Sequence, residues 1–205
     1  MDKKTTKTRQ SEEQTRFNMT KTHHKETFLK AKKDGKVDKD FIPFCEYILK
    51  TKNYFTSSCC AGRISLVGLN ENEEKKESAF HRKWHRKVTY NEIKEGVQSY
   101  NGHILWFKQE PLILHLGTNT LENAKKILEV CEKAGVKRAG IKVAKKGKLI
   151  LEILGTHNIN APIKENKFCV EEKYLKYLVK KANEKFEKNQ EMLKKLEKQV
   201  KKELK

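Results

Sequence analysis

The stretch AGIKVAKKGKLILEIL, residues 139–154, sets two short apolar runs on either side of a basic turn that contains glycine. The runs Ala139 to Ala144 and Leu149 to Leu154 have the length and the residue types of β-strands. Lys145-Lys146-Gly147-Lys148 between them supplies the glycine that a tight connection needs. The pattern predicts a β-hairpin, and therefore a fold that contains antiparallel sheet.

A helix is expected immediately before this hairpin. Asn119 and Glu122 have the spacing of an N-terminal cap, and Gly135 is a typical helix stop. Between them, apolar side chains recur every three or four residues: Leu121, Ala124, Ile127, Leu128, Cys131 and Ala134. This period predicts a helix with one buried face.

The segment before that helix repeats the same order of elements. Thr89 and Glu92 have the spacing of a capping box, which opens a helix. Residues 103–107 and 111–116 are two short apolar runs. They predict a second hairpin, with Pro111 at the start of its second strand, where the missing N–H matters least.

The remaining segments add helices and one strand. Residues 1–22 are basic and polar with little to bury, so we expect a flexible arm. A short helix is expected at 23–33, and a second from about Asp40. Residues 64–69 are typical of a strand. Residues 171–205 carry apolar side chains at spacings of three and four and predict a long helix.

These elements predict an α+β fold. We expect a mixed, largely antiparallel sheet built from the two hairpins and the strand at 64–69, covered by helices. The expected domains are the arm at 1–22, a catalytic core at 23–170, and a C-terminal helix at 171–205 that packs on the core and extends from it. Residues 70–78 are expected to form a charged loop. Because no GxxxxGK[ST] or GxGxxG motif occurs, neither a P-loop nucleotidase nor an ordinary dinucleotide-binding fold is expected.

The composition favours a polyanionic partner. The 205 residues include 46 Lys and Arg against 27 Asp and Glu, a formal net charge of +19 at pH 7. Such a surplus attracts phosphates, so nucleic acid is the first partner expected. The five cysteines form no CxxC pair and no metal-ligand spacing, and their odd number argues against a full disulfide framework. The sequence has no apolar stretch of ~20 residues and no signal peptide, so we expect a cytoplasmic protein with no membrane contact. Because no metal-ligand spacing occurs, no metal is expected.

The most site-like sequence is TSSCCAGRI, Thr56 to Ile64, which follows an aromatic pair. It gathers two hydroxyls, two thiols, a glycine and an arginine. Glycine lets a ligand approach the backbone, arginine binds carboxylate or phosphate, and hydroxyls both donate and accept hydrogen bonds. The composition indicates the floor of a binding pocket. A nucleophilic thiol at Cys59 or Cys60, with a histidine as its partner, is a further interpretation.

Three other segments carry titratable side chains. The run HRKWHRK, residues 81–87, interleaves basic residues with one aromatic, which is typical of RNA contact and equally of an exposed edge strand. Glu110 and His115 stand at the two ends of an apolar strand, on opposite faces by its period of two. Each is a candidate for a site or for a structural role, Glu110 as a turn cap and His115 as a hydrogen-bonded core histidine. His157 lies in a polar loop after a buried strand, a common place for site residues.

Six blocks of this sequence occur together in one known family. They are YFTSSCCAGRI (54–64), WHRKV (84–88), FKQEPLILHL (107–116), AGVKRAGIKVAKKGKLIL (134–151), GTHNINAPI (155–163) and EKYLKYLVKKANEKFEKN (172–189). In these blocks the chain resembles the wybutosine-synthesis N-methyltransferases, the third wybutosine-synthesizing protein of archaea and eukaryotes. Ala139 and Gly155 depart from the resemblance, since the family usually has serine at both positions.

The resemblance implies an enzyme that uses S-adenosyl-L-methionine as its cofactor, and we expect that its α+β fold is not that of a Rossmann-type methyltransferase. Its substrate would be the tricyclic 4-demethylwyosine-type base, made from the guanosine 3′ of the anticodon of phenylalanine tRNA, and the product would carry one more N-methyl group. The anticodon loop of this tRNA is therefore the expected partner, and a monomer is favoured. The alternative is a non-catalytic basic module that only binds RNA.

Within these blocks we assign roles by residue type. The candidate catalytic residues are His85, Glu110, His115 and His157, and the sequence does not choose among the histidines. The candidate cofactor-binding residues are Ser57, Ser58, Cys59, Gly62, Arg63, Trp106, Pro111 and Thr156. The candidate RNA-binding residues are Arg82, Lys83, Trp84, Arg86 and Lys87. We expect the TSSCCAGRI run and the segment that bears Glu110 and His115 to form one crevice.

Overall fold

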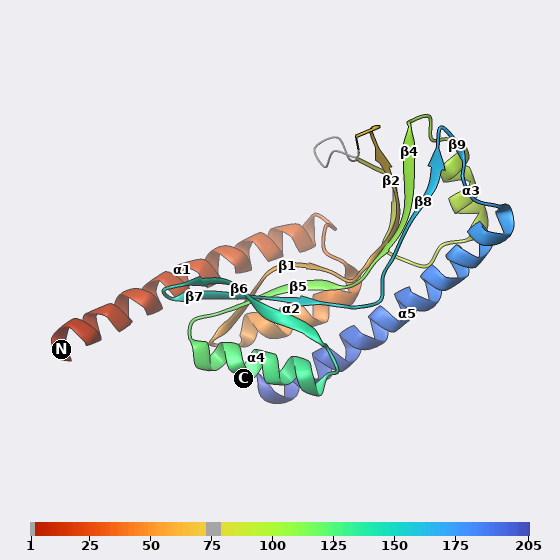
Figure 1. The fold of residues 1–205 in the computed structure, drawn as a ribbon. Coiled ribbons are helices and arrows are strands. Elements are labelled where there is room, and N and C mark those ends of the chain that lie inside the picture. Colours follow the sequence, from red (N-terminus) through yellow and green to blue (C-terminus); the bar gives the residue numbers. More distant parts are fainter. Residues whose placement is uncertain (1–2, 73–78) are drawn as a thin grey trace. The chain divides into compact units, whose positions relative to one another are not determined.

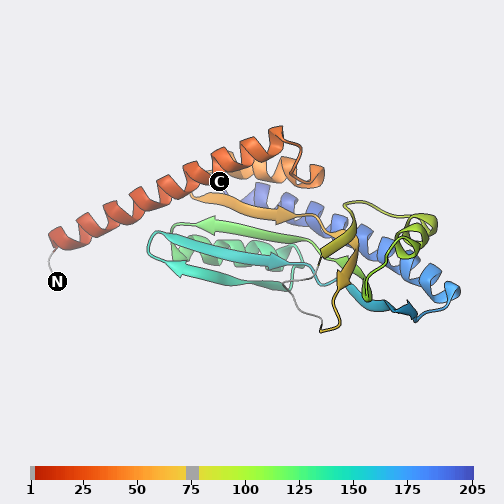
Figure 2. The ribbon, with the colours of Figure 1, turned by 90° about the horizontal axis from the view of Figure 1, so that it is seen from above.

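The computed structural model describes residues 3–72 and 79–205 (Figures 1 and 2). Part of the charged loop expected at 70–78 therefore lies outside the described residues. The chain forms two compact units, each assembled from separate segments. Unit 1 comprises Met1–Ala61, Ile113–Gly155 and Met192–Lys205, and unit 2 comprises Gly62–Leu112 and Thr156–Glu191. This division differs from the single core predicted for 23–170.

Unit 1 contains a four-stranded antiparallel sheet in the order β1-β5-β7-β6 (Figure 1). Its strands are β1 (Tyr54–Cys60), β5 (Ile113–Thr118), β7 (Lys148–Leu154) and β6 (Arg138–Lys145). The hairpin predicted within 139–154 is confirmed as β6 and β7, and Gly147 in its turn has a φ of 67°. A left-handed residue at this position explains the glycine.

Three helices pack in unit 1 with the last turns of the C-terminal helix. They are α1 (Lys3–Lys33), α2 (Ile42–Lys50), which follows the short η1 (Lys39–Phe41), and α4 (Leu121–Lys133). Helix α2 carries Pro43 in its first turn, as predicted. Helix α4 is capped by Thr120, whose Oγ1 accepts a hydrogen bond from the backbone N–H of Asn123, so the cap predicted at Asn119 is wrong by one residue.

Helix α1 replaces the flexible arm that was predicted for residues 1–22. It is continuous from Lys3 to Lys33, and Figure 2 shows it beside β1. Phe17 is fully buried, with its ring 5.9 Å from that of Phe55, and His24 stacks on Phe55 at 4.9 Å. These aromatic contacts stabilise the helix against the sheet, although most of its residues are polar. The predicted stop at Asp34-Gly35 is confirmed, since Gly35 has a φ of 67°.

Unit 2 contains a five-stranded antiparallel sheet in the order β3-β2-β4-β8-β9. Its strands are β3 (Ala79–Trp84), β2 (Arg63–Leu69), β4 (Ile104–Glu110), β8 (Ile159–Glu165) and β9 (Lys167–Phe168). Its helix α3 (Tyr90–Gln98) begins with the predicted capping box at Thr89 and Glu92. Leu66 and Phe107 from the sheet pack in one apolar core with Ile93 of α3.

The long C-terminal helix is confirmed as α5 (Glu172–Glu203), and its residues belong to both units. Within unit 2, Leu175 and Leu178 of α5 join the apolar core. No helix of residues 3–72 and 79–205 combines the length and the apolar character that a membrane crossing requires.

The second predicted hairpin, 103–107 with 111–116, is wrong. Both strands exist as β4 and β5, but β4 pairs with β2 and β8 whereas β5 pairs with β1 and β7. The α+β class and the antiparallel pairing hold, while the single predicted sheet is two sheets. Apolar runs report that strands are present, but the choice of partner depends on residues far away in the chain.

The cap of α3 gives a stability prediction that depends on pH. Glu92 accepts hydrogen bonds from Arg86 (2.6 Å) and from the backbone N–H of Thr89 (2.8 Å), and these lower its pKa to about 2. Because the folded pKa is depressed, the stabilisation is complete above the unfolded pKa of about 4.5 and is lost as the pH falls toward about 2. We therefore expect Glu92→Gln to reduce the unfolding free energy at pH 7 and to match the unaltered chain near pH 2. Urea unfolding at several pH values measures this, with Glu191→Gln at an exposed position as the control.

Candidate functional site

An extra residue in β1 determines which way the TSSCCAGRI run points its side chains. Thr56 pairs with Leu116, but Ser58 pairs with His115, so Ser57 is a bulge between them. A bulge shifts the alternation of side chains by one position. The ring of Phe55 lies over Gly117, and His115 is two residues before Gly117, so the shift brings Ser58 to the face that carries both Phe55 and His115.

Ser58, His115 and Glu152 form one hydrogen-bonded row across three neighbouring strands. Ser58 Oγ lies 2.7 Å from His115 Nδ1, and His115 Nε2 lies 3.2 Å from Glu152 Oε2. The three residues are direct partners in the register of β1, β5 and β7. On the opposite face the same strands carry fully buried apolar side chains: Leu114, Leu116, Leu151 and Ile153. The row is therefore mounted on a rigid strip of sheet.

Lys142 completes the row from the fourth strand. It is the extra residue of a second irregularity, between Ile141 and Val143 of β6, and its Nζ lies 3.3 Å from Glu152 Oε1. Burial would raise the pKa of Glu152, but the hydrogen bonds from His115 and Lys142 outweigh it and lower that pKa. Glu152 is therefore a carboxylate at neutral pH, and it accepts hydrogen bonds on both oxygens.

A pocket opens beside Ser58. It has a volume of about 180 Å³ and lies between β1, α1 and the chain that follows α1. Its lining residues are His24, Thr27, Phe28, Ala31, Lys36, Val37, Cys45, Thr56, Ser57, Ser58 and Cys59. A second hollow, of about 350 Å³, opens at the other end of the row and is lined by Glu152, Lys142 and Arg138 among others. The row of polar side chains thus connects two concave regions of unit 1.

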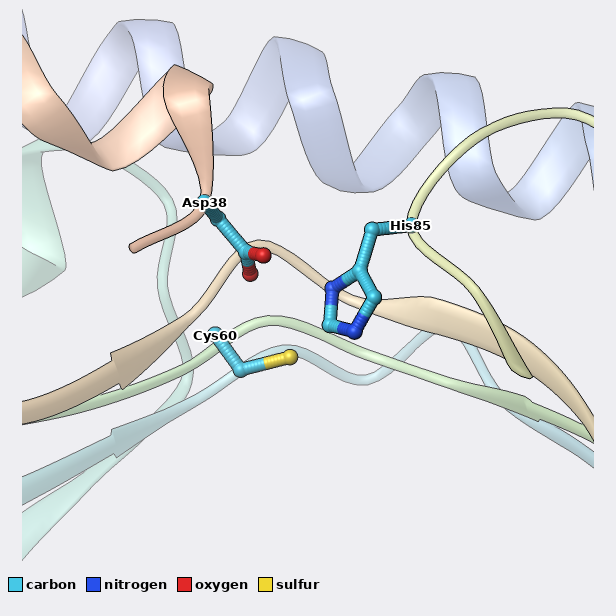
Figure 3. Close-up of side chains that lie close together, drawn as sticks. All are labelled: Asp38, Cys60 and His85. Carbon is cyan, nitrogen blue, oxygen red and sulfur yellow. The ribbon is translucent and has the colours of Figure 1, made fainter. Parts of the chain in front are cut away.

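The two thiols of the TSSCCAGRI run have different surroundings. Cys59 Sγ lies 3.9 Å from Cys45 Sγ, and this contact together with burial raises the pKa of the Cys59 thiol. Cys60 lies close to Asp38, whose carboxylate accepts a hydrogen bond of 2.7 Å from the backbone N–H of Ala61 (Figure 3). A thiol kept protonated is a poor nucleophile, so the geometry does not favour catalysis by Cys59.

We expect iodoacetamide at neutral pH to modify Cys169 well before Cys59. Cys169 is exposed, whereas the thiol of Cys59 is partly buried and has a raised pKa. Peptide mass spectrometry after short labelling times measures both sites, and Cys131, whose pKa burial raises to about 12, serves as the unreactive reference. Rapid modification of Cys59 would instead support the thiol-dependent interpretation.

In unit 2, Arg63 and Glu110 form an ion pair between β2 and β4. The two residues are direct partners in the register, and Arg63 Nε donates to Glu110 Oε2. The guanidinium also lies over the ring of Phe80, 4.7 Å from its centre. Gly62 precedes this pair with a φ of 97°, and a Cβ there would lie 2.9 Å from the carbonyl oxygen of Glu110. A glycine is thus required next to the ion pair.

The remaining candidates of unit 2 have mixed surroundings. Trp84 packs against the apolar core, so its first role is structural. Trp106 is partly exposed, with Lys108 Nζ 5.5 Å from its ring centre. Burial lowers the pKa of His157, and nearby lysines add to this effect, so its imidazole favours the neutral form. Thr156 and His85 are exposed, and His85 follows β3 (Figure 3).

The basic run at 81–87 begins on β3, an edge strand of its sheet. One of the two sequence interpretations predicted an exposed edge strand here. Arg82 and Lys83 of β3 are exposed. Arg86 forms an ion pair with Glu92, and Lys87 Nζ lies 2.6 Å from Glu187 Oε1. Ion pairs with acidic side chains thus hold two of the four basic candidates in this segment.

The structure brings together some of the residues predicted from sequence. Ser58 contacts His115 in unit 1, and Gly62 and Arg63 lie beside Glu110 in unit 2. The single crevice predicted to contain both groups stays a prediction. Sequence reasoning missed Glu152 and Lys142, although a lone carboxylate in the apolar strand LILEIL was a usable signal.

Comparisons with known proteins converge on one family. The model of the family described as "Methyltransferase TYW3" matches residues 13–202. A Thermococcus kodakarensis relative, 36% identical over 187 residues that cover 91% of this chain and 94% of the relative, is named tRNA(Phe) 7-((3-amino-3-carboxypropyl)-4-demethylwyosine(37)-N(4))-methyltransferase 1. A Methanocaldococcus jannaschii relative of the same activity is 32% identical and covers 80% of this chain and 86% of its own length.

Solved structures support the same relationship. The PH1069 protein from Pyrococcus horikoshii superposes with a TM-score of 0.85 at 34% identity, over 90% of this chain and 95% of that protein. A hypothetical protein from Aeropyrum pernix, at 24% identity and a TM-score of 0.69, shares the fold. The fold described above is thus also found in solved structures.

Proposed function

Because the chain belongs to the TYW3 methyltransferase family, we propose that it methylates N4 of 7-(3-amino-3-carboxypropyl)-4-demethylwyosine at position 37 of phenylalanine tRNA. The observation that carries the proposal is the match of 91% of this chain to a methyltransferase named for that reaction. The net charge of +19 supports a nucleic-acid substrate independently. We place the reaction in the cytoplasm and expect a monomer to perform it on the anticodon loop.

We propose S-adenosylmethionine as the methyl donor. When bound, S-adenosylmethionine would supply a methyl group attached to a sulfonium sulfur. A nitrogen lone pair can attack this methyl carbon in line with the carbon–sulfur bond. Its amino-acid end carries a carboxylate and an ammonium group. Arg63 and Glu110 present the two opposite charges side by side, with 28% and 34% of their side-chain surfaces exposed, so these residues fit such a group.

The other roles assigned from sequence extend this proposal. The other candidates for contact with the cofactor are Ser57, Ser58, Cys59, Gly62, Trp106, Pro111 and Thr156. The candidate bases are His85, His115 and His157. The candidates for contact with the tRNA are Arg82, Lys83, Trp84, Arg86 and Lys87. Positioning of the reacting atoms and removal of a proton from the acceptor would supply most of the rate enhancement.

The test is nucleoside mass spectrometry. Precursor tRNA that carries the unmethylated tricycle is incubated with the protein and with S-adenosylmethionine labelled in its methyl group. One labelled methyl on the tricyclic nucleoside is the expected result. An RNA-binding module would retard the tRNA in a gel and bind no S-adenosylmethionine in calorimetry, and this outcome would contradict the proposal.

A further inference from the structure

The row of polar side chains in unit 1 leaves the imidazole of His115 without a free ring nitrogen. Nε2 faces Glu152 at 3.2 Å, and Nδ1 faces Ser58 at 2.7 Å. His115 therefore reaches a ligand only through the hydroxyl of Ser58, which is exposed and lines the pocket beside β1. The atom that meets a substrate is thus Ser58 Oγ, and the imidazole stands behind it.

The direction of each hydrogen bond follows from the charge of Glu152. A carboxylate only accepts, so His115 Nε2 carries the hydrogen that it donates to Glu152. In the neutral imidazole Nδ1 then has the lone pair, and Ser58 Oγ donates its proton to Nδ1. Lys142 donates to the second oxygen of Glu152 and keeps the carboxylate in place. The hydrogen bonds therefore run from Ser58 to His115 to Glu152, and Lys142 donates to Glu152 from the other side.

We propose that Ser58 and His115, held by Glu152 and Lys142, are the proton relay that deprotonates the acceptor nitrogen during methyl transfer. This inference rests on the proposed function. It moves Ser58 from the cofactor site to the relay, and it chooses His115 among the three candidate histidines. Ser58 touches the substrate, whereas Glu152 and Lys142 are positioning residues.

The step balances in atoms and charge. The acceptor nitrogen bears a hydrogen where the product bears the methyl group. As the nitrogen lone pair forms the bond to the methyl carbon, the carbon–sulfur bond breaks and its electron pair stays on sulfur, which becomes a neutral thioether. The N–H proton passes to Ser58 Oγ while the Ser58 proton passes to His115 Nδ1. The positive charge of the sulfonium thus ends on an imidazolium, which Glu152 stabilises.

The charged groups around the relay come from four parts of unit 1. Glu152 lies on β7 and Lys142 on β6, in contact with the row. His24 of α1 and Lys36 line the same pocket as Ser58. Only Glu152 is anionic among these, and it contacts the imidazole directly, so it is the group that stabilises a proton on His115.

The test compares single-turnover methyl transfer by Ser58→Ala, His115→Gln and Glu152→Gln with that of the unaltered chain. We expect Ser58→Ala and His115→Gln to lose about 100-fold or more near pH 7, within the range of general-base catalysis, and Glu152→Gln about 10-fold. The losses shrink as the pH rises, because solvent base then removes the same proton. Ser58→Thr, which keeps a hydroxyl, recovers most of the rate. Glu122→Gln on α4, which removes the same charge from an exposed ion pair, leaves the rate unchanged.

Two further measurements separate the relay from other roles. Nitrogen NMR of the imidazole is expected to show hydrogen on Nε2 and a lone pair on Nδ1, and to change in Glu152→Gln. Calorimetry is expected to give Ser58→Ala the S-adenosylmethionine affinity of the unaltered chain. A large loss of that affinity, or a rate defect that is constant with pH, would overturn the relay. Absence of methylation by the unaltered chain would refute the proposed function itself, and the role of Ser58 and His115 as its base with it.

Discussion

Methyl transfer falls by about 100-fold when Arg63 is replaced by methionine. The variant leaves the carboxylate of Glu110 without its partner and removes the cation proposed to bind the carboxylate of the methyl donor. A lost charge-assisted contact of about 2.7 kcal/mol corresponds to that factor. The measurements are single-turnover rates and calorimetric affinity for S-adenosylmethionine, and the affinity is expected to carry most of the loss.

The matched control for Arg63→Met is Arg16→Met on helix α1. Arg16 is exposed, and its replacement lowers the net charge by the same single unit. Any general weakening of tRNA attraction therefore appears in both variants, while the loss of a specific contact appears in one. Equal affinities of the two variants for the methyl donor would show that Arg63 does not bind it.

The largest loss of stability is expected for Phe107→Ala in unit 2. Phe107 is fully buried on β4, between Leu66 of β2 and Ala161 of β8 in the register. Truncation of a buried phenylalanine removes its apolar contacts and leaves a cavity, which costs about 3–5 kcal/mol of unfolding free energy. Urea unfolding followed by tryptophan fluorescence measures the effect.

Phe168→Ala is the companion variant for Phe107→Ala. Phe168 lies on β9 in the same unit, but 49% of its surface is exposed. The same chemical change there is expected to cost less than about 1 kcal/mol, because little apolar area is lost from the interior. A cost for Phe107→Ala as small as that of Phe168→Ala would contradict the core described for unit 2.

Local patterns predicted most of the elements of this fold. The hairpin within 139–154, the capping box at Thr89 and Glu92, and the apolar period of α5 each depend on residues close together in sequence. The partners of β4 and β5 depend on β2, β8, β1 and β7, which lie tens of residues away. Period and propensity describe one strand at a time, so they do not determine which sheet it joins.

The sequence indicated only two of the four residues in the polar row. His115 and Ser58 stood out by residue type, but their contact depends on the bulge at Ser57, and no residue there signals a bulge. Glu152 and Lys142 lie in two strands whose sequence predicted a hairpin and no functional site. The first part of helix α1 was missed for a related reason, since a few apolar side chains such as Phe17 are buried and most of its other residues are polar.

The order of segments along the chain limits how this protein can be taken apart. Unit 1 uses three separate segments and unit 2 uses two, so the backbone passes from one unit to the other at residues 61–62, 112–113, 155–156 and 191–192. No single truncation yields either unit whole, and neither can be transplanted as one contiguous cassette. A minimal fragment for expression would have to be rewired by circular permutation with new linkers, and point variants are the practical way to dissect this chain.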